Sequence, residues 1–387
     1  MHIAYLIPTI DRIGGAERQL LLLANGMAER GWRVTLISLY GDGQPLANQL
    51  TAANLSFISL GMTSGLSDAH GWNTLRQLIK SAPPDILHSH LAQAALMGRG
   101  IRAIAPLRVL IDTIHSPATG SSTRRRGYRL TSSIPDCVTA VSRTAARTWL
   151  DAGIVDERTI TVIPNGIDSR RWPLKTTGAR RSNRSDEFRW LAVGRLEPVK
   201  DYATMLHAFA MLPQTARLSI CGSGPLENEL RALATRLDLQ ERVLFLGFQT
   251  NLAQLMQAHD AFVLSSRWEG LPMALLEASA CGLPAVFTDI DGCREVLTSS
   301  SLPTAPVGNP KALAIAMKAL MNLPESARIE LGHRGRKQIV SRFDLSSVLD
   351  QWELLYRQLL AKNPKRRRFR LRASLSLPAN SLKSFSL

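Results

Sequence analysis

The sequence has few cysteines and no long apolar run, and both shortages narrow the kind of protein it encodes. Its four cysteines stand in or beside apolar segments, without C-x-x-C spacing. That pattern excludes a zinc ribbon or a disulfide framework and predicts reduced core thiols in a cytosolic protein. No apolar run approaches about 18 residues, and no basic region followed by an apolar core and cleavage site opens the chain, so we expect neither a membrane-spanning helix nor a secretory signal. The cysteines are Cys137, Cys221, Cys281 and Cys293.

Two nucleotide-binding fingerprints are also missing. The sequence contains no G-x-G-x-x-G followed by an acidic residue about 20 positions later, which disfavours a dinucleotide-dependent oxidoreductase. It contains no G-x-x-x-x-G-K-[ST], which excludes a P-loop NTPase. The oxidoreductase stays open only as an alternative, because doubly wound sheets also serve that chemistry.

Acidic residues are scarce relative to basic ones. The chain has 47 Lys plus Arg against 31 Asp plus Glu, a formal net charge of +16. Much of the excess lies in residues 124–126, 180–184 and 365–372. Such patches attract polyanions, which include nucleic acid, anionic lipid and phosphorylated substrates. A nucleic-acid-binding protein is therefore a second alternative, but the basic tail offers only Phe369 for stacking, and we expect no nucleic acid partner.

The chain reads as two α/β units in tandem. With 387 residues and 45% hydrophobic content, its length favours two packed domains. Short apolar strands alternate with helical periods, then stop at a polar, basic stretch and resume after it, which predicts parallel sheets covered on both faces. The predicted divisions are an N-terminal domain (1–168), a linker (169–187), a C-terminal domain (188–343), a C-terminal helix (344–361) and a basic, disordered tail (362–387).

The nonapeptide EGLPMALLE follows the apolar segment DAFVLSS and carries the strongest local signal. Pro272 suits the first position of a helix that continues with good helix formers. Glu269 then lies in the loop before the helix and Glu277 inside it, on the order of 12 Å along the axis at the usual rise per residue. That separation matches a sugar joined through a diphosphate to a ribose, and the free amides between them suit an anion. An ordinary surface glutamate before an amphipathic helix is the plainer interpretation.

Three further strand ends carry loops that suit phosphates or hydroxyls, and ligands in parallel α/β sheets lie at this edge. Gly14 and Gly15 open a helix after the first strand. Arg195 and Lys200 follow the first strand of the second unit and could clamp a diphosphate. Tight turns and solvated surface charges are the alternatives for each loop taken alone. The next strand ends in a turn with Gly222 and Gly224.

Taken in order, GGAER, PNGID, GRLEPVKD, CGSGP, FLGF and EGLPMALLEA resemble glycosyltransferase family 4, the retaining transferases of GT-B fold. The resemblance covers about residues 1–360. It implies two Rossmann-like, doubly wound domains that face a central cleft, with the acceptor in the N-terminal domain and the donor in the C-terminal one. The extension after the last helix has no counterpart in it.

The resemblance also implies roles for single residues. Arg195 and Lys200 match the pair that holds the donor diphosphate, Glu277 matches the acid on the ribose hydroxyls, and Glu269 matches the acid near the transferred sugar. His115 resembles the histidine beside the reaction centre. The remaining donor-binding positions implied are Gly14, Gly15, Gly222, Gly224, Gly270, Leu271, Pro272, Met273 and Ala274.

The implied reaction is front-face transfer with retention, in which the cations stabilise the departing nucleotide and neither a metal nor another cofactor takes part. The expected partners are a UDP- or GDP-linked sugar, a lipid-linked or glycan acceptor in bacterial surface polysaccharide or glycolipid synthesis, and the anionic inner face of the cell membrane. His88 and His90 point to one face of their strand. They could ligate a metal, or could border the acceptor cleft, which we favour.

Overall fold

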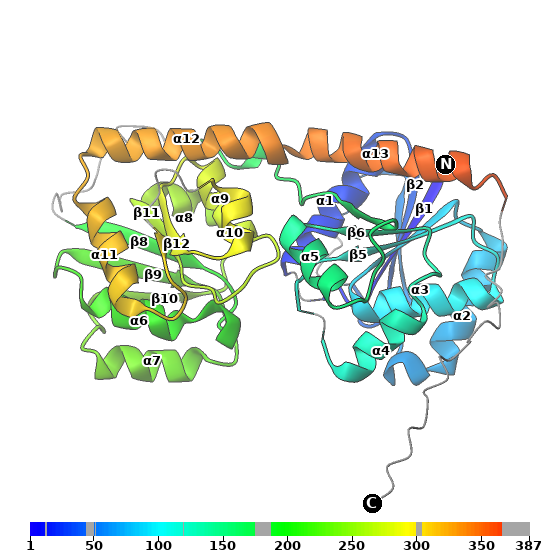
Figure 1. The fold of residues 1–387 in the computed structure, drawn as a ribbon, viewed down its shortest axis with the longest axis horizontal. Helices are drawn as coiled ribbons and strands as arrows, with labels where there is room; N and C mark the ends of the chain where they lie inside the picture. Colours follow the sequence, from blue (N-terminus) through cyan, green and yellow to red (C-terminus); the bar gives the residue numbers. More distant parts are fainter. Residues whose placement is uncertain are drawn as a thin grey trace, which may run out of the picture.

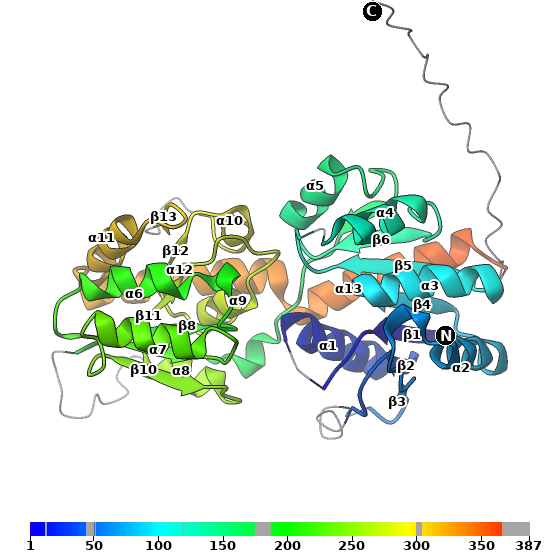
Figure 2. The same ribbon diagram turned by 90° about the horizontal axis from the view of Figure 1, so that it is seen from below.

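The computed structural model describes residues 1–11, 14–43, 50, 52–118, 120–174, 187–298 and 304–365. It has two lobes, each built on one parallel sheet, and two helices run end to end along one side of both lobes (Figure 1). Helices lie on both faces of each sheet (Figure 2). The basic residues 180–184, most of the linker and the tail beyond residue 365 lie outside the described part of the chain.

The first sheet has seven strands in the order β3-β2-β1-β4-β5-β6-β7. Alternate side chains enter opposite faces: Tyr5 packs with α1 and α13, while Leu6 packs with α2 and α3. Its strands are β1 (His2–Ile7), β2 (Arg33–Ser38), β3 (Leu55–Ser59), β4 (Ile86–His90), β5 (Val109–Ile114), β6 (Cys137–Ala140) and β7 (Ile160–Val162). Its helices are α1 (Gly15–Glu29), α2 (Ala69–Ser81), α3 (Ala92–Ile104), α4 (Ser122–Leu130) and α5 (Arg143–Asp151), with the short turns η2 (Gly65–Ser67) and η3 (Ser169–Arg171).

The second sheet has six strands in the order β10-β9-β8-β11-β12-β13. Both sheets therefore have the doubly wound strand order, in which the direction of strand addition across the sheet switches between β1 and β4 and between β8 and β11. Its strands are β8 (Phe188–Val193), β9 (Ala216–Cys221), β10 (Val243–Gly247), β11 (Ala261–Leu264), β12 (Ala285–Thr288) and β13 (Thr304–Ala305). Its helices are η4 (Pro198–Lys200), α6 (Tyr202–Ala210), α7 (Glu227–Arg236), α8 (Leu252–Ala258), α9 (Met273–Ala280), α10 (Asp291–Val296), α11 (Pro310–Met321) and α12 (Glu325–Phe343).

The last helix, α13 (Leu345–Lys362), returns to the first lobe. Trp352 and Tyr356 are buried in the core beside β1 and α1, and the Tyr356 hydroxyl lies 3.2 Å from that of Tyr5. The two segments that connect the lobes are also hydrogen-bonded to each other. The Ile167 amide donates to the Phe343 carbonyl, and the Leu345 amide donates to the Ile167 carbonyl. The C-terminal helix therefore belongs to the first core by its contacts.

The apolar segments expected as strands all form strands, and the two parallel sheets are confirmed. The two-residue strand β13 was not expected. All four cysteines are free and buried, as predicted. Within the described residues, no helix is long and apolar enough to cross a membrane. The exact division into domains stays a prediction.

Candidate functional site

The candidate site lies at the edge of both sheets where the strand order switches, after β1 and β4 and after β8 and β11. In the second sheet, β8 and β11 are neighbours, and the loops after them are joined. The Arg267 amide donates to the Val199 carbonyl at 2.8 Å, and the Ser265 hydroxyl donates to the Lys200 carbonyl at 2.8 Å. Asp201, in the left-handed conformation (φ 49°), caps α6 and ends the first loop. The two loops expected to bind the donor therefore form one unit.

Lys200 and Glu269 meet inside this unit. The Lys200 Nζ lies 2.5 Å from Glu269 Oε1, and the Ser266 hydroxyl donates to the same oxygen at 2.7 Å. Both side chains are largely buried, with 18% and 14% of their surface exposed. A charge-assisted pair of this kind is short and fixes both side chains in place. The sequence grouped these residues by role, but the direct contact is a finding of the structure.

Arg195 has a different setting from Lys200. Its side chain is 71% exposed and pairs with Glu197 at 2.8 Å. Burial raises the pKa of Glu17 on α1, and backbone hydrogen bonds and the charge of Arg195 oppose that rise. Arg195 therefore acts on the first turn of α1 in the other lobe, while Lys200 faces Glu269.

Gly222 and Gly224 have a structural role whatever ligand binds. A Cβ at Gly222 would lie 2.0 Å from the Gly194 carbonyl oxygen, and one at Gly224 would lie 2.5 Å from that of Leu196. Gly222 also has a φ of +146°, which side chains rarely adopt. These glycines let the loop after β9 lie directly on the loop after β8. Their contact with a donor stays a prediction.

Glu277 is reached from the other lobe. The Arg18 Nη1, on the first turns of α1, donates to Glu277 Oε1 at 2.8 Å, and the glutamate side chain is only 4% exposed. Burial raises the pKa of Glu277, and the charge and hydrogen bond of Arg18 oppose that rise. Arg18 was not among the predicted site residues, although it stands in the GGAER motif beside the glycines that were.

The loops of the two lobes touch at Gly270. A Cβ there would lie 2.6 Å from the His115 carbonyl oxygen. At Gly15 a Cβ would lie at an ordinary 3.6 Å from the Met273 side chain, and the Asn165 amide approaches the Met273 sulfur at 3.5 Å. Pro272 is the N-cap of α9 and not its first helical residue as expected, because its ψ of 97° is extended.

His115 directly follows β5 at this boundary and bonds to a second histidine. Its Nε2 lies 2.9 Å from Nδ1 of His90, and burial lowers the pKa of His115 to about 4. His115 is therefore neutral near pH 7. Its catalytic role stays a prediction.

The expectation that His88 and His90 border an acceptor cleft is wrong. They are 0% and 2% exposed, and burial holds the pKa of each well below its usual range. His88 bonds to the Tyr356 hydroxyl at 2.9 Å and to the Thr113 hydroxyl at 2.6 Å. The returning helix α13 covers this face of β4, so the strand ends in core and not in open surface.

A metal site at these histidines finds no support in their surroundings. Over the ranges that the structure describes, no three His, Cys, Asp or Glu side chains gather closely enough to hold a metal ion. The sequence does contain one D-x-D run at residues 289–291, but both of its aspartates pair with Arg294. Whether the reaction needs a metal stays open to experiment.

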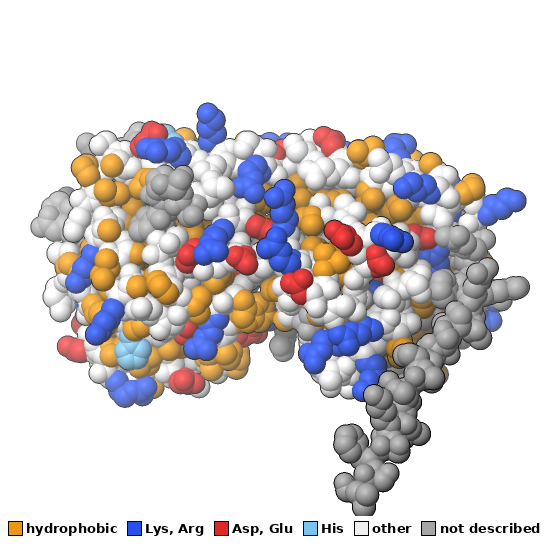
Figure 3. Space-filling view, in the orientation of Figure 1, with side chains coloured by type: hydrophobic (Ala, Val, Ile, Leu, Met, Phe, Trp, Pro, Cys, Tyr) orange, Lys and Arg blue, Asp and Glu red, His pale blue; other side chains and the backbone are white. Residues whose placement is uncertain are grey.

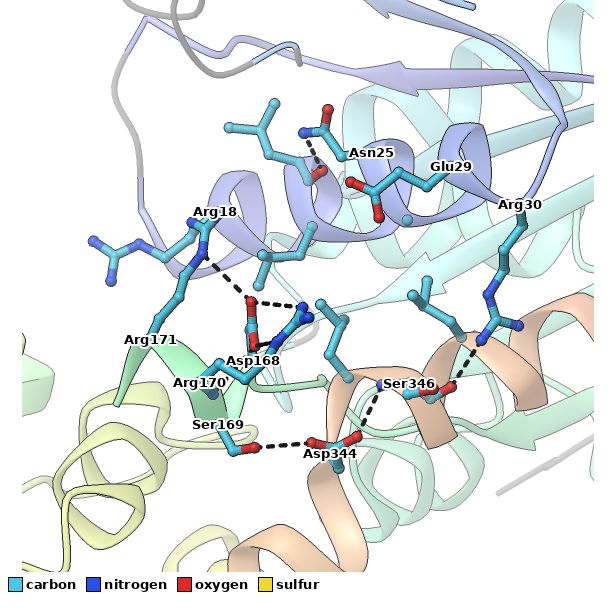
Figure 4. A pocket seen from close by; sticks show the side chains of 15 residues that line it. Arg18, Asn25, Glu29, Arg30, Asp168, Ser169, Arg170, Arg171, Asp344 and Ser346 are labelled. Atoms are coloured by element: carbon cyan, nitrogen blue, oxygen red, sulfur yellow. Dashed lines mark hydrogen bonds and ion pairs between the residues drawn. The ribbon is translucent and has the colours of Figure 1, made fainter. Parts of the chain in front are cut away.

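A cavity of about 680 Å³ lies between α1, residues 168–171 and the start of α13 (Figure 4). Arg18 lines it, and Arg170 and Arg171 both pair with Asp168 on its wall. Of the described residues predicted for the donor site, none lines this cavity. It is therefore a neighbour of the candidate site and not the site itself.

Two family profiles cover most of the chain. Residues 13–171 match the profile described as Glycosyltransferase Family 4, and residues 177–338 match Glycosyl transferases group 1. Among solved structures, the Anabaena protein HepE, in complex with UDP and glucose, superposes with a TM-score of 0.80 at 21% identity, covering 92% of this chain and 100% of that one. Sucrose-phosphate synthase from Thermosynechococcus elongatus superposes with a TM-score of 0.80 at 20% identity, covering 94% and 100%. These likenesses establish the GT-B fold.

Two characterised relatives agree with the profiles. The Escherichia coli UDP-Gal:alpha-D-GlcNAc-diphosphoundecaprenol alpha-1,3-galactosyltransferase is 29% identical over 247 residues, which are 59% of this chain and 63% of that enzyme. The lipopolysaccharide core biosynthesis glycosyltransferase LpsE of Rhizobium meliloti is 27% identical over 354 residues, 91% of this chain and 97% of that enzyme. With this fold, these loops and these relatives, the chain belongs to glycosyltransferase family 4.

Proposed function

We propose that the protein transfers a sugar, with retention, from a nucleotide-diphosphate sugar to a lipid-linked or glycan acceptor in bacterial surface polysaccharide or glycolipid synthesis. The observation that supports this most directly is the buried Lys200–Glu269 pair at the point where the strand order of the second sheet switches. There the C-terminal edge of the sheet faces α1 and His115 of the other lobe. A donor held at this edge would present its sugar to an acceptor on the opposite lobe.

In the proposed reaction, Lys200 and Arg195 bind the donor diphosphate and stabilise the charge that grows on it as the sugar leaves. Glu277 accepts hydrogen bonds from the ribose hydroxyls, and Glu269, held by Lys200 and Ser266, lies near the transferred sugar. Neutral His115 borders the acceptor side. The bond between the sugar and the donor phosphate breaks, and the acceptor hydroxyl bonds to the sugar from the same face. The departing phosphate takes the hydroxyl proton, so the proposed step needs no metal.

The nucleotide is UDP in this proposal. The Escherichia coli relative is named for UDP-Gal and for an acceptor carrying diphosphoundecaprenol. HepE was solved with UDP and glucose. GDP-linked sugars stand as the second choice, because the diphosphate and ribose contacts above do not read the base.

A screen of nucleotides and nucleotide sugars tests this function. At 100 times its dissociation constant the correct donor should stabilise the fold by about 2.7 kcal/mol and raise Tm, and it should be hydrolysed or transferred to an undecaprenyl-diphosphate glycan. Product anomer analysis should give retention, and turnover should persist in chelator. Absence of any stabilising nucleotide would contradict the proposal, and loss of turnover in EDTA, restored by magnesium, would contradict the metal-free step.

The proposed acceptor reaches the site from the membrane, with α4 as the docking surface. This helix follows the loop after His115 and carries residues 124–126 and Arg129. Lys and Arg side chains gather in this part of the first lobe (Figure 3). Leu130, the last residue of the same helix, is 66% exposed. Tyr128 holds the helix to the core through Arg99, whose guanidinium lies 4.5 Å from the Tyr128 ring centroid. A basic surface with an exposed aliphatic side chain suits the anionic inner leaflet.

We expect the chain to bind vesicles that contain anionic lipid, with affinity that falls as salt rises. Each cation near the leaflet contributes about 1 kcal/mol, screened within about 8 Å at physiological salt. Changing residues 124–126 to glutamine should weaken cosedimentation, and truncation after Ala361 should weaken it further. The matched control changes the exposed Arg231, Arg236 and Arg334 of the other lobe. Equal binding by all variants would contradict the docking surface.

A further inference from the structure

Arg18 belongs to the N-terminal lobe but contacts a predicted donor-binding residue of the C-terminal lobe. The donor is expected to bind the C-terminal domain, yet the described partner of Glu277 is a guanidinium on α1 of the N-terminal domain, at 2.8 Å. The two residues are 259 positions apart in the chain. We propose that Arg18 is a positioning residue for the donor ribose, acting through Glu277, so that full donor affinity requires both lobes to be together.

The need for Arg18 follows from the burial of Glu277. A carboxylate that is 4% exposed loses most of its hydration, and burial favours its neutral form. In a neutral carboxyl, one oxygen carries the proton and is a donor, which leaves less capacity to accept. An ionised carboxylate can accept from two hydroxyls at once. The nearby guanidinium favours the ionised form, in keeping with the direction in which Arg18 moves the pKa of Glu277.

Glu277 has enough acceptor sites to bond to a ribose and to Arg18 together. Arg18 uses one nitrogen, Nη1, on one carboxylate oxygen, Oε1. A carboxylate offers about four lone-pair sites, so Glu277 can accept from ribose hydroxyls while it keeps this bond. The Arg18 side chain is 37% exposed and borders the cavity of Figure 4, which means that it approaches Glu277 from outside the C-terminal core.

Arg18 also lies among the other contacts that join the lobes. Gly270 touches the His115 carbonyl, and the Arg143 and Thr144 amides at the start of α5 donate to the Glu295 carboxylate of α10. Gly270 is also assigned to the donor, but its contact with His115 is through backbone, whereas the Arg18–Glu277 pair reaches the side chain assigned to the donor ribose. It therefore connects the contact between the lobes to the residue assigned to the ribose. This inference rests on the proposed role of Glu277.

Calorimetric titration with UDP tests the inference. We expect Arg18→Ala to weaken UDP binding about tenfold, because Glu277 loses the guanidinium that keeps its carboxylate ionised and in place. Arg18→Lys should recover most of the affinity, because it restores the positive charge. Arg30→Ala is the matched control: Arg30 follows α1 and lines the same cavity, but it pairs with Asp350 and Glu353 of α13. It should bind UDP like the unchanged protein.

A double-mutant cycle separates positioning from direct contact. In a Glu277→Gln background, adding Arg18→Ala should change UDP affinity less than twofold, because Arg18 acts through the carboxylate. An equal loss in both backgrounds, unchanged binding by Arg18→Ala, or tighter binding by it would overturn the inference. Tm and circular dichroism identify any variant that has unfolded, and Arg18→Lys then carries the comparison. An unchanged protein that binds neither UDP nor GDP would instead overturn the proposed donor site, and the inference with it.

Discussion

Changing Lys200 to methionine is expected to lower kcat by about 100- to 1000-fold, the range seen when one preorganised cationic or hydrogen-bonding group is removed from a reacting centre. Methionine keeps much of the length of the side chain and removes the ammonium that lies 2.5 Å from Glu269. The loss should fall on kcat more than on donor KM, because the charge on the leaving nucleotide grows during the reaction. Steady-state kinetics with the donor found by the screen measures both.

Lys200→Arg and Lys311→Met are the comparisons for this prediction. Arginine keeps the charge but not the compact ammonium that fits Glu269, so a partial recovery is expected. Lys311 lies exposed on α11, and its replacement should leave turnover unchanged. Near-normal kcat in Lys200→Met would mean that the cation has no part in leaving-group stabilisation.

Gly270→Ala is expected to lower kcat/KM by about 100-fold or more, while the protein stays folded. A new Cβ would stand 2.6 Å from the His115 carbonyl oxygen, which is backbone and cannot turn aside. The lobes must then shift relative to each other, and a misplacement of about 1 Å at a reacting centre can cost about 100-fold. The clash lies between the lobes, so neither hydrophobic core loses contacts. Steady-state kinetics of this variant tests the loss of kcat/KM, and thermal unfolding tests whether it stays folded.

Gly335→Ala provides the control. Gly335 lies in α12, and a Cβ there meets its neighbours at ordinary distances of 3.7 and 3.9 Å. Activity should be unchanged, and stability should rise by about 0.5–1 kcal/mol, since alanine is the better residue inside a helix. A fully active Gly270→Ala variant, or one that unfolds far below the control, would contradict the role assigned to this close approach.

The sheets could be predicted because their signal is local. Strands buried on both faces need continuous apolar runs, and segments such as those around Tyr5, Trp190 and Phe262 meet that need without reference to distant parts of the chain. The loops after them were predictable for the same reason. Glycines and charged residues at the C-terminal end of a parallel strand have a known place at the edge of the sheet.

The error about His88 and His90 came from the path of the chain after its last strand. The spacing of His88 and His90 correctly placed them on one face of β4, but spacing does not say what covers that face. Trp352 and Tyr356 do, from a helix that crosses back to the first lobe. The hydrophobic pattern around Trp352 and Tyr356 predicted a helix, but it did not indicate which surface that helix packs against.

The sequence by itself determined two parallel sheets, the alternation of strands and helices along the chain, and the loops that carry charged residues and glycines. Only the tertiary structure decided which of those charges meet. Lys200 and Glu269 are 69 residues apart, and Arg18 and Glu277 are 259 residues apart and on different lobes. Periodicity and propensity act over a few residues, whereas an ion pair depends on the position of whole domains, which is set by packing across the full chain.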